Sequence, residues 1–399
     1  MKHHITIILA WLCALHLGAQ EPVDSAAQQM AWPQSLQWRL SAIENDNLLQ
    51  TSDAAVMVYD LTADSAIYAF HHQHILRPAS VMKLLTAVTA LDLMGADYRF
   101  TTDLLQQGET SGRTFTGDIY VVGHFDPMLT TADLLPFADK IKSMDIDTIC
   151  GNLYADLSMK EETVWGEGWC WDDDNPTLSP LLVNRKSDFT RQLADVMAAQ
   201  GITVKSQLGT AKCPATATKL CTLSHTLAQV LQPMMKESDN LYAEAVFYQL
   251  AWSQDHRQAT AKEARAVERR LINNIGLDPS LYRVADGSGL SLYNYVSAEL
   301  LVALLRYAYS RERIYQPLFA SLPLMGIDGT LKSRLRDSVA RGRVSAKTGT
   351  VTGVSSLAGY QQAPNGHMLA FAIINQGVMQ SKLGRLFQDQ ICQIIAETE

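Results

Sequence analysis

The chain has 399 residues, 47% of them apolar and 19% charged, and its formal net charge is −8. These proportions are ordinary for a soluble globular protein, and the length predicts two domains or one domain with a large insertion. The negative charge and the lack of a Lys/Arg run argue against nucleic acid as a partner.

Residues 1–19 have the pattern of a secretory signal peptide. Lys2 supplies the positive start, residues 5–17 supply a short apolar stretch, and Gly18-Ala19 supply small residues before an expected cut. The apolar stretch is short for a membrane span, so a retained anchor is the less favoured alternative. We therefore expect export to the periplasm, an oxidising compartment, and no stable membrane anchor.

An odd number of cysteines follows this segment, so at least one must be unpaired or pair between chains. Cys213 and Cys221 flank a segment that resembles a hairpin, and we expect them to form a disulfide bridge. Buried free thiols are the alternative. The five cysteines are Cys150, Cys170, Cys213, Cys221 and Cys392.

The first predicted elements are a hairpin and a buried helix. Residues 54–60 and 65–70 are short strand-like runs joined by a turn-like tetrapeptide. Pro78 stands where a helix entry tolerates proline, and residues 80–94 predict a helix that ends before Gly95. Apolar side chains cover nearly all sides of this helix, so we expect it to be buried.

The middle of the chain differs from its two ends. Residues 97–186 are rich in short strands and turns, whereas long helical patterns return from residue 189 onward. We predict an α/β (α+β) catalytic domain built from residues 20–96 and 187–399, with residues 97–186 as a strand-rich inserted domain. The apolar face of the last helix, residues 383–397, is expected to pack on the sheet and not on a membrane. The other predicted elements of the second half are helices at 189–200, 225–236, 238–252, 260–275 and 297–309 and strands at 343–347, 356–360 and 368–375.

Three short motifs occur in a fixed order along the chain. Residues 80–83 are Ser-Val-Met-Lys, residues 238–240 are Ser-Asp-Asn, and residues 347–349 are Lys-Thr-Gly. Each is weak evidence alone, because Ser-Asp-Asn is commonly a helix cap and Lys-Thr-Gly commonly a strand end. Together and in this order they are the signature of penicillin-binding proteins and class A β-lactamases.

The first motif has the residue types that an activated nucleophile needs. Ser80 lies at or near a helix start, where backbone N–H groups and the helix dipole favour developing negative charge. Lys83 lies one turn further on the same face. Burial against an apolar helix would help Lys83 to lose its proton, and a neutral amine beside a hydroxyl can activate it.

The other two motifs have the residue types that hold a substrate. The Ser238 hydroxyl can relay a proton between Lys83 and a leaving group, and the Asn240 amide can hold a substrate carbonyl. Lys347 and Thr348 can bind a carboxylate, and the small Gly349 lets a ligand lie along the strand edge.

Longer blocks around these motifs resemble class C low-molecular-weight penicillin-binding proteins, the D-alanyl-D-alanine carboxypeptidase/endopeptidases of peptidase family S13. The resemblance extends over about residues 50–380 and keeps the family's order. The blocks are residues 77–83 (Arg-Pro-Ala-Ser-Val-Met-Lys), 123–127 (Gly-His-Phe-Asp-Pro), 169–173 (Trp-Cys-Trp-Asp-Asp), 238–244 (Ser-Asp-Asn-Leu-Tyr-Ala-Glu), 286–291 (Asp-Gly-Ser-Gly-Leu-Ser), 326–330 (Gly-Ile-Asp-Gly-Thr) and 346–350 (Ala-Lys-Thr-Gly-Thr).

The resemblance implies the penicillin-recognising, β-lactamase-like serine hydrolase fold, in which helices flank an antiparallel sheet. It implies a serine-type D-Ala-D-Ala carboxypeptidase that acts on peptidoglycan stem peptides and is inhibited covalently by β-lactams. It leaves open D,D-endopeptidase activity on cross-links, and it implies no cofactor or metal. The implied roles are Ser80 as acyl-enzyme nucleophile, Lys83 as general base, Ser238 in proton transfer, Asn240, Lys347, Thr348, Gly349 and Thr350 in substrate binding, and the backbone N–H groups of Ser80 and Thr350 as the oxyanion hole.

The chain departs from the family pattern in the insertion. Ser80 and Ser238 are 238 − 80 = 158 residues apart, which is shorter than usual for the family, and some tens of residues are missing between Asn184 and Phe189. Any site carried by the missing part, including a reader of the stem-peptide side chain, cannot be transferred to this chain.

Two other functions compete with the carboxypeptidase hypothesis. A class A β-lactamase would carry a glutamate four residues before an asparagine, which Leu182-Val183-Asn184 lacks, and its motifs would lie closer together. A catalytically idle wall-binding protein of the same fold would have no need for an intact Lys83. The histidines at 71–74 and the aspartates at 172–174 resemble metal ligands but are expected to be loop residues.

Overall fold

A computed structural model describes residues 30–172, 175–205 and 207–399 of the chain. The predicted signal peptide lies outside these residues, as do Asp173 and Asp174. Within the described part, the helices are all too short or too polar to cross a membrane.

The central sheet is made from both ends of the chain. It has five antiparallel strands in the order β10-β11-β12-β1-β2, so the N-terminal hairpin pairs with the last strand. β10 lies at the edge of this sheet, with a neighbouring strand only on its β11 side. The strands are β1 (Asp53–Asp60), β2 (Ser65–Phe70), β10 (Val344–Val351), β11 (Val354–Gln362) and β12 (Met368–Gln376).

Helices cover both faces of the central sheet. α2 (Gln34–Ser41) and α11 (Ser381–Glu397) pack on one face, where their apolar side chains share a core with residues such as Phe371 and Ile373. α9 (Ala298–Tyr309) packs on the other face. Neighbouring strand residues point to opposite faces, which is why β12 contributes side chains to both cores. The apolar face of α11 is therefore buried against the sheet.

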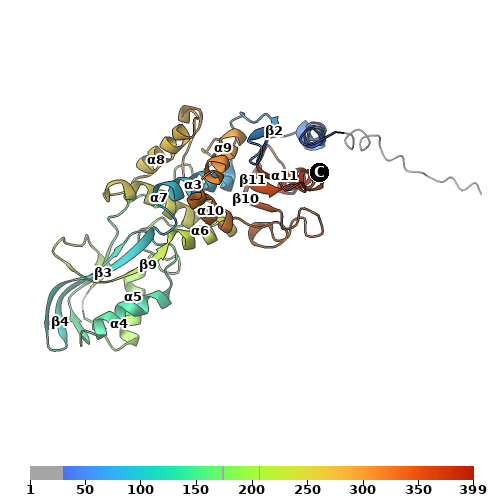
Figure 1. Ribbon diagram of the computed structural model, residues 1–399. Coiled ribbons are helices and arrows are strands. Elements are labelled where there is room, and N and C mark those ends of the chain that lie inside the picture. The colour runs from blue at the N-terminus through green and yellow to red at the C-terminus, as the bar shows by residue number, and fades with distance from the viewer. Residues whose placement is uncertain (1–29, 173–174, 206) are drawn as a thin grey trace, which may run out of the picture.

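A group of helices around α3 makes the larger core. α3 (Lys83–Leu93) is buried along nearly its whole length and lies at the centre of this group, beside α7 and α10 (Figure 1). The predicted helix at 80–94 is split, because residues 79–82 form the 3₁₀ turn η3 (Ala79–Met82). The other members are α6 (Leu227–Lys236), α7 (Asn240–Asp255), α8 (Ala261–Asn274), η5 (Pro279–Leu281) and α10 (Glu312–Ser321). Three short turns contribute instead to the core beneath α2 and α11: η1 (Ala42–Asn45), η2 (Asn47–Gln50) and η6 (Gly329–Leu331).

A second sheet projects from this helical group at the lower left of Figure 1. It has seven strands, with β3, β4 and β9 antiparallel and the shorter strands parallel to their neighbours. α4 and α5 pack on it around a separate apolar core. The elements are β3 (Arg99–Ser111), β4 (Thr114–Gly123), η4 (Thr131–Leu134), α4 (Leu135–Lys142), β5 (Thr148–Cys150), β6 (Leu153–Asp156), α5 (Phe189–Ala199), β7 (Thr203–Val204), β8 (Leu208–Thr210) and β9 (Thr218–Thr226).

The second sheet continues past the expected boundary at residue 186. α5 buries Phe189 and Leu193 in the core of the second sheet, and β9 pairs with β3. The amphipathic pattern at 189–200 predicts a helix correctly, but such a pattern does not tell which core the helix covers. We therefore propose that the inserted unit runs from about residue 97 to Thr226, with the discontinuous unit formed by the residues on either side.

The expected Cys213–Cys221 bridge is not formed, because both residues are free thiols. Cys221 lies in β9 opposite Leu104 of β3, and Cys213 lies in the loop after β8. The segment between them is thus a loop that leads into β9, and not a hairpin. Burial raises the pKa of both thiols, which keeps them protonated.

Candidate active site

The amine of Lys83 lies within hydrogen-bonding distance of the Ser80 hydroxyl. Lys83 Nζ donates to Ser80 Oγ at 3.0 Å, to Asn240 Oδ1 at 2.7 Å and to the carbonyl oxygen of Ser288 at 2.8 Å. Lys83 is fully buried, and burial lowers the pKa of its amine to about 8, although nearby carboxylates oppose the shift. A minority of this amine is therefore neutral near pH 7, and this fraction can accept the Ser80 proton.

A strained turn delivers Ser80 to this position. Ala79 has φ +50°, a left-handed conformation that costs free energy for a residue with a side chain. The preceding carbonyl oxygen, on Pro78, accepts a hydrogen bond from Ser356 Oγ of β11 at 2.6 Å. The central sheet thus fixes the turn, and α3 then begins at Lys83 with its side chain one turn below the serine.

The side chains of Ser238 and Asn240 face the site. Asp239, which lies between them in the sequence, caps the start of α7. The Asp239 carboxylate accepts from the backbone N–H groups of Leu241 and Tyr242 at the start of α7. The side chain of Ser238 turns toward Lys347 of β10, and the side chain of Asn240 turns toward Lys83. The Ser-Asp-Asn motif is therefore both a helix cap and a part of the site.

β10 contributes Lys347, which is buried and reaches across to the second motif. Lys347 Nζ donates to Ser238 Oγ at 2.7 Å and to the carbonyl oxygen of Thr348 at 2.8 Å. Burial and the nearby charge of Lys83 hold the pKa of the Lys347 amine well below its usual range. Thr348 Oγ1 donates to Thr330 Oγ1 at 2.8 Å, and Thr350 is exposed at the end of the strand.

Gly349 has a role that the sequence did not predict. A Cβ atom there would collide with Ser356 Oγ, the Pro78 carbonyl oxygen and the Ser80 backbone nitrogen. Glycine therefore lets β10 lie directly against the nucleophile turn, in addition to any room it makes for a ligand. The structure thus brings all eight predicted residues into one region, from Ser80 and Lys83 through Ser238 and Asn240 to residues 347–350.

Comparison with known proteins identifies the family of this chain. The sequence profile of the D-Ala-D-Ala carboxypeptidase 3 (S13) family matches residues 36–182 and 180–398. The chain belongs to this peptidase family. The match confirms the predicted S13 resemblance and the predicted class of D-Ala-D-Ala carboxypeptidase. The two matched segments meet at residues 180–182, near the place where the sequence indicated missing residues.

Relatives of this S13 chain include curated and structurally characterised proteins. The D-alanyl-D-alanine carboxypeptidase of Actinomadura sp. (strain R39) is 28% identical over 436 residues, covering 85% of this chain and 80% of that protein. Penicillin-binding protein 4 (dacB) from Haemophilus influenzae superposes with a TM-score of 0.80 at 21% identity, covering 87% of this chain and 98% of that one. The penicillin G-acylated endopeptidase Bd3459 from Bdellovibrio bacteriovorus gives 0.61 at 18% identity, with 86% and 92% covered. These structures confirm the predicted fold.

The S13 chain uses a buried carboxylate to shape the loop behind Lys83. Asp286 accepts four hydrogen bonds, from Gly289 N at 2.8 Å, Ser291 N at 2.7 Å, Asn294 Nδ2 at 2.7 Å and Trp169 Nε1 at 2.8 Å. This arrangement fixes the loop that presents the Ser288 carbonyl oxygen to Lys83. Residues 286–291 resemble a family block, but the sequence alone does not predict this structural role for them.

Two buried glutamates stand behind the same loop. Glu244 Oε1 accepts from Ser288 N at 2.8 Å, and burial raises the pKa of Glu244 to about 8. Glu268 accepts from Thr86 Oγ1 at 2.9 Å, and burial raises its pKa well above the usual range. The position of Glu244 near the site could have been predicted from the sequence, because Glu244 lies four residues after Asn240 on the same face of α7.

A polar cavity of about 360 Å³ opens beside the Ser-Asp-Asn motif. Asp239, Asn240 and Arg185 line it, together with residues 175–177. Arg185 forms an ion pair with Asp239. The cleft is therefore bounded by the inserted unit as well as by the helices of the catalytic part.

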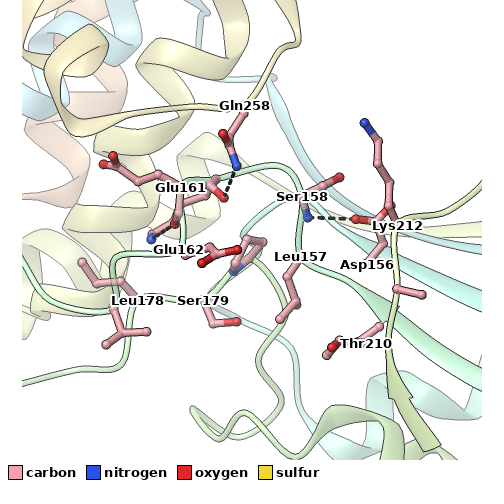
Figure 2. Close-up of a pocket in the computed structure, with 15 residues that line it drawn as sticks. Asp156, Leu157, Ser158, Glu161, Glu162, Leu178, Ser179, Thr210, Lys212 and Gln258 are labelled. Carbon is pink, nitrogen blue, oxygen red and sulfur yellow. Dashed lines mark hydrogen bonds between the residues drawn. The ribbon is translucent and has the colours of Figure 1, made fainter.

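A second cavity, of about 450 Å³, lies where the inserted unit meets α7 and α8 (Figure 2). Two of its polar side chains are already engaged: Lys160 Nζ donates to the carbonyl oxygens of Glu161 and Thr163, and Asp156 accepts from Ser158 N and Cys213 N. None of its lining residues belongs to the three motifs. This cavity is a feature of the junction and not of the reactive site.

Proposed function

We propose that this protein is an exported D-Ala-D-Ala carboxypeptidase that cleaves the last peptide bond of peptidoglycan stem peptides through an acyl-enzyme on Ser80. The observation that carries the proposal is the 3.0 Å contact between the buried Lys83 amine and the Ser80 hydroxyl. A buried amine of lowered pKa beside a hydroxyl is the arrangement that nucleophilic catalysis requires.

Acylation begins when neutral Lys83 takes the Ser80 proton and Ser80 Oγ attacks the carbonyl carbon of the penultimate D-alanine. The negative charge that develops on the carbonyl oxygen is stabilised by the backbone N–H groups of Ser80 and Thr350. The C–N bond then breaks, and Ser238 passes a proton to the departing amine of the terminal D-alanine and receives in its place the proton that Lys83 took from Ser80, so that Lys83 is neutral again. A water molecule later attacks the ester and restores the Ser80 hydroxyl.

The remaining residues hold the peptide in place. Lys347, with Thr348 and Thr350, binds the terminal carboxylate, because the negative charge of the carboxylate favours the charged form of the buried Lys347 amine and the two hydroxyl groups can donate to its oxygens. Asn240 Oδ1 already accepts from Lys83, so its Nδ2 group is left to donate to a carbonyl of the substrate. The strained amide of a β-lactam would enter the same cleft and acylate Ser80.

Replacing Ser80 with alanine tests the assignment directly. We expect S80A to lose labelling by a fluorescent penicillin and release of D-alanine from a pentapeptide, because no other group can form the ester. The matched control is S143A, which removes an exposed hydroxyl on the inserted unit. Retained labelling of S80A would contradict the proposal. Turnover of the wild-type penicillin adduct within seconds would instead identify a β-lactamase.

Cleavage of cross-links is a second activity that the cleft supports. The polar cavity beside Asn240 gives room for a leaving group larger than D-alanine, as the second stem peptide of a cross-link would be. Mass analysis of the products from purified cross-linked wall fragments measures both activities at once. Release of D-alanine without loss of dimers would rule out the endopeptidase activity.

A further inference from the structure

The first part of the outer edge of β10 is covered by the segment that leads into η6. Ala346 N donates to the carbonyl oxygen of Pro323 at 3.0 Å, and Met325 N donates to the carbonyl oxygen of Val344 at 2.9 Å. In an antiparallel sheet, alternate residues direct their N–H and C=O groups to the same edge. The next residue after Ala346 that faces the outer edge is therefore Thr348. We call residues 323–330 the covering segment.

The covering segment stands where an extended substrate would end. The proposed function places the reacting carbonyl at Thr350 and the terminal carboxylate at Lys347 and Thr348, so a peptide that adds to this edge runs antiparallel to β10. Beyond Thr348 the edge is already paired with the covering segment at Ala346. The carboxyl end of the peptide therefore comes to lie between Thr348 and the covering segment.

Thr330 adds a further hydroxyl group at this place. Thr330 Oγ1 accepts a hydrogen bond from Thr348 Oγ1 at 2.8 Å. Both side chains are partly exposed, so a ligand can reach the hydroxyl of Thr348. Thr330 belongs to the block at residues 326–330, for which the sequence predicted no role in the site.

The covering segment is fixed to the loop that carries Ser238. Asp328 accepts from Lys236 Nζ at 2.6 Å. Gly329 has φ +52°, and a Cβ atom there would lie 2.6 Å from the carbonyl oxygen of Lys236, which is why glycine is needed at this close approach. Lys236 stands two residues before Ser238. The backbone that carries Thr330 is thus held in place before any substrate arrives.

The two threonine hydroxyls can reverse their hydrogen bond. A hydroxyl group has one hydrogen and two lone pairs, and Thr348 donates its hydrogen to Thr330 in the free enzyme. When a carboxylate arrives, Thr348 turns this hydrogen toward the anion, and Thr330 can then donate its own hydrogen to Thr348 Oγ1. Hydrogen bonds in such a chain strengthen one another, and the last one is assisted by the charge of the carboxylate.

We propose that Thr330 is a positioning residue, which orients the Thr348 hydroxyl toward the terminal carboxylate and so favours ligands that carry a free carboxylate. This inference rests on the proposed function. The ligand class is a peptide that ends in D-Ala-D-Ala, or a β-lactam, with its carboxylate unmodified. Thr330 acts through Thr348 and takes no part in the transfer of the Ser80 proton.

Two β-lactams that differ only at the carboxylate test the proposal. The probes are benzylpenicillin and its methyl ester, and the measurement is the second-order rate constant for acylation by each. We expect T330V to be acylated about tenfold more slowly by benzylpenicillin, the typical effect of one hydrogen bond, and to keep the wild-type rate with the ester within about twofold. T330S, which restores the hydroxyl, should keep both rates. An unchanged rate with benzylpenicillin, or an equal fall with both compounds, would overturn the inference.

A second variant shows whether Thr330 acts through Thr348. Adding T330V to T348V should slow acylation by benzylpenicillin by less than about twofold, because the hydroxyl that Thr330 orients is already absent. A tenfold fall in that background would contradict a positioning role. T330A removes the same hydroxyl and provides the same comparisons if T330V does not fold. T116V, at an exposed threonine of β4, is the matched control and should keep the wild-type rates.

The peptide reaction separates this inference from the proposed function. The probe is Nα,Nε-diacetyl-L-Lys-D-Ala-D-Ala, and release of D-alanine gives kcat and KM. We expect T330V to lower kcat/KM about tenfold, mainly through KM. Equal kcat/KM values for an active wild-type protein and T330V would overturn the inference and leave the carboxypeptidase assignment intact. No release of D-alanine and no penicillin acylation of the wild-type protein would overturn both.

Discussion

The amine of Lys83 is enclosed by Ser80, Asn240 and the Ser288 carbonyl, so protein groups and not water set its protonation. Charged residues surround it from several elements: Asp286 in the loop after α8, Glu244 and Asp239 at α7, and Lys347 in β10. The carboxylates favour the charged amine, whereas burial opposes it and is the larger effect. Lys83 can therefore act as a base and still be held in place when it is charged.

The rate of acylation should follow the neutral fraction of Lys83. With a pKa of about 8, about one amine in ten is neutral at pH 7, compared with about one in three thousand for a lysine of ordinary pKa. We expect the second-order rate constant for acylation by benzylpenicillin to rise about tenfold per pH unit below pH 7.5 and to level off above pH 8.5. Stopped-flow measurement of acylation between pH 5.5 and 9 checks this profile.

The variant K83Q provides the control for that profile. It keeps a hydrogen-bonding side chain of similar length but has no titrating amine, so acylation should be slower by a factor of about 10² to 10⁴ and almost independent of pH over the same range. A wild-type profile that is flat, or a K83Q profile that keeps the same rise, would show that another group accepts the proton.

At the scale of elements, β10 and the nucleophile turn must touch for the site to form. Gly349→Ala would place a methyl group against Pro78, Ser80 and Ser356 and push the strand away from the turn. We expect G349A to lower the free energy of unfolding by about 1–3 kcal/mol, as overpacking does. We also expect penicillin acylation to fall about 100-fold, because a displacement of about 1 Å in a reacting group has that effect.

Gly366→Ala is the matched control for this change. Gly366 has φ +88° and open space around the position of a Cβ atom, so G366A introduces backbone strain without a collision at the site. Urea unfolding and acylation rates of both variants separate the two effects. If G366A lost acylation as strongly as G349A, general destabilisation and not local displacement would be the cause.

The elements show where sequence reasoning succeeds and where it fails. Ser80, Lys83, Asn240 and Lys347 could be predicted because their types and order are tied to chemistry that tolerates little substitution. The split at Ala79 could not be predicted, because its left-handed backbone depends on Ser356, which is distant in the sequence.

At the scale of the whole molecule, sequence patterns identified an insertion but not its full extent. Strand-rich composition was recognisable up to residue 186, whereas α5 has the same amphipathic pattern as the helices of the catalytic part. Its assignment depends on Phe189 and Leu193 packing against the second sheet, a long-range fact that periodicity does not contain. The same limit applied to the thiols of Cys213 and Cys221, whose pairing depends on the path of β9.

The junction between the inserted unit and the helices is held by Lys160. The side chain of Lys160 is buried, its amine donates to two backbone carbonyl oxygens, and it lies 4.8 Å from the centre of the Tyr248 ring on α7. Gln258, before α8, donates to the Lys160 carbonyl oxygen at 3.3 Å. These contacts join the loop after β6 to α7 and to the segment between α7 and α8.

Lys160→Ala should therefore weaken the whole fold and leave the chemistry of the site in place. Removing the side chain takes a hydrogen bond from each of two partly buried carbonyl oxygens and leaves a gap beside Tyr248, so we expect the free energy of unfolding to fall by about 2 to 4 kcal/mol. Lys212 lines the same cavity but is exposed, and its side chain extends away from the other labelled residues in Figure 2. K212A should change stability by less than about 0.5 kcal/mol.

Denaturant unfolding measures the stability of both variants, and penicillin acylation measures the state of their reactive sites. If the K160A variant were acylated more slowly at a temperature where it is fully folded, the junction would be needed to position Ser80. The cavity of Figure 2 and the reactive cleft would then be mechanically coupled.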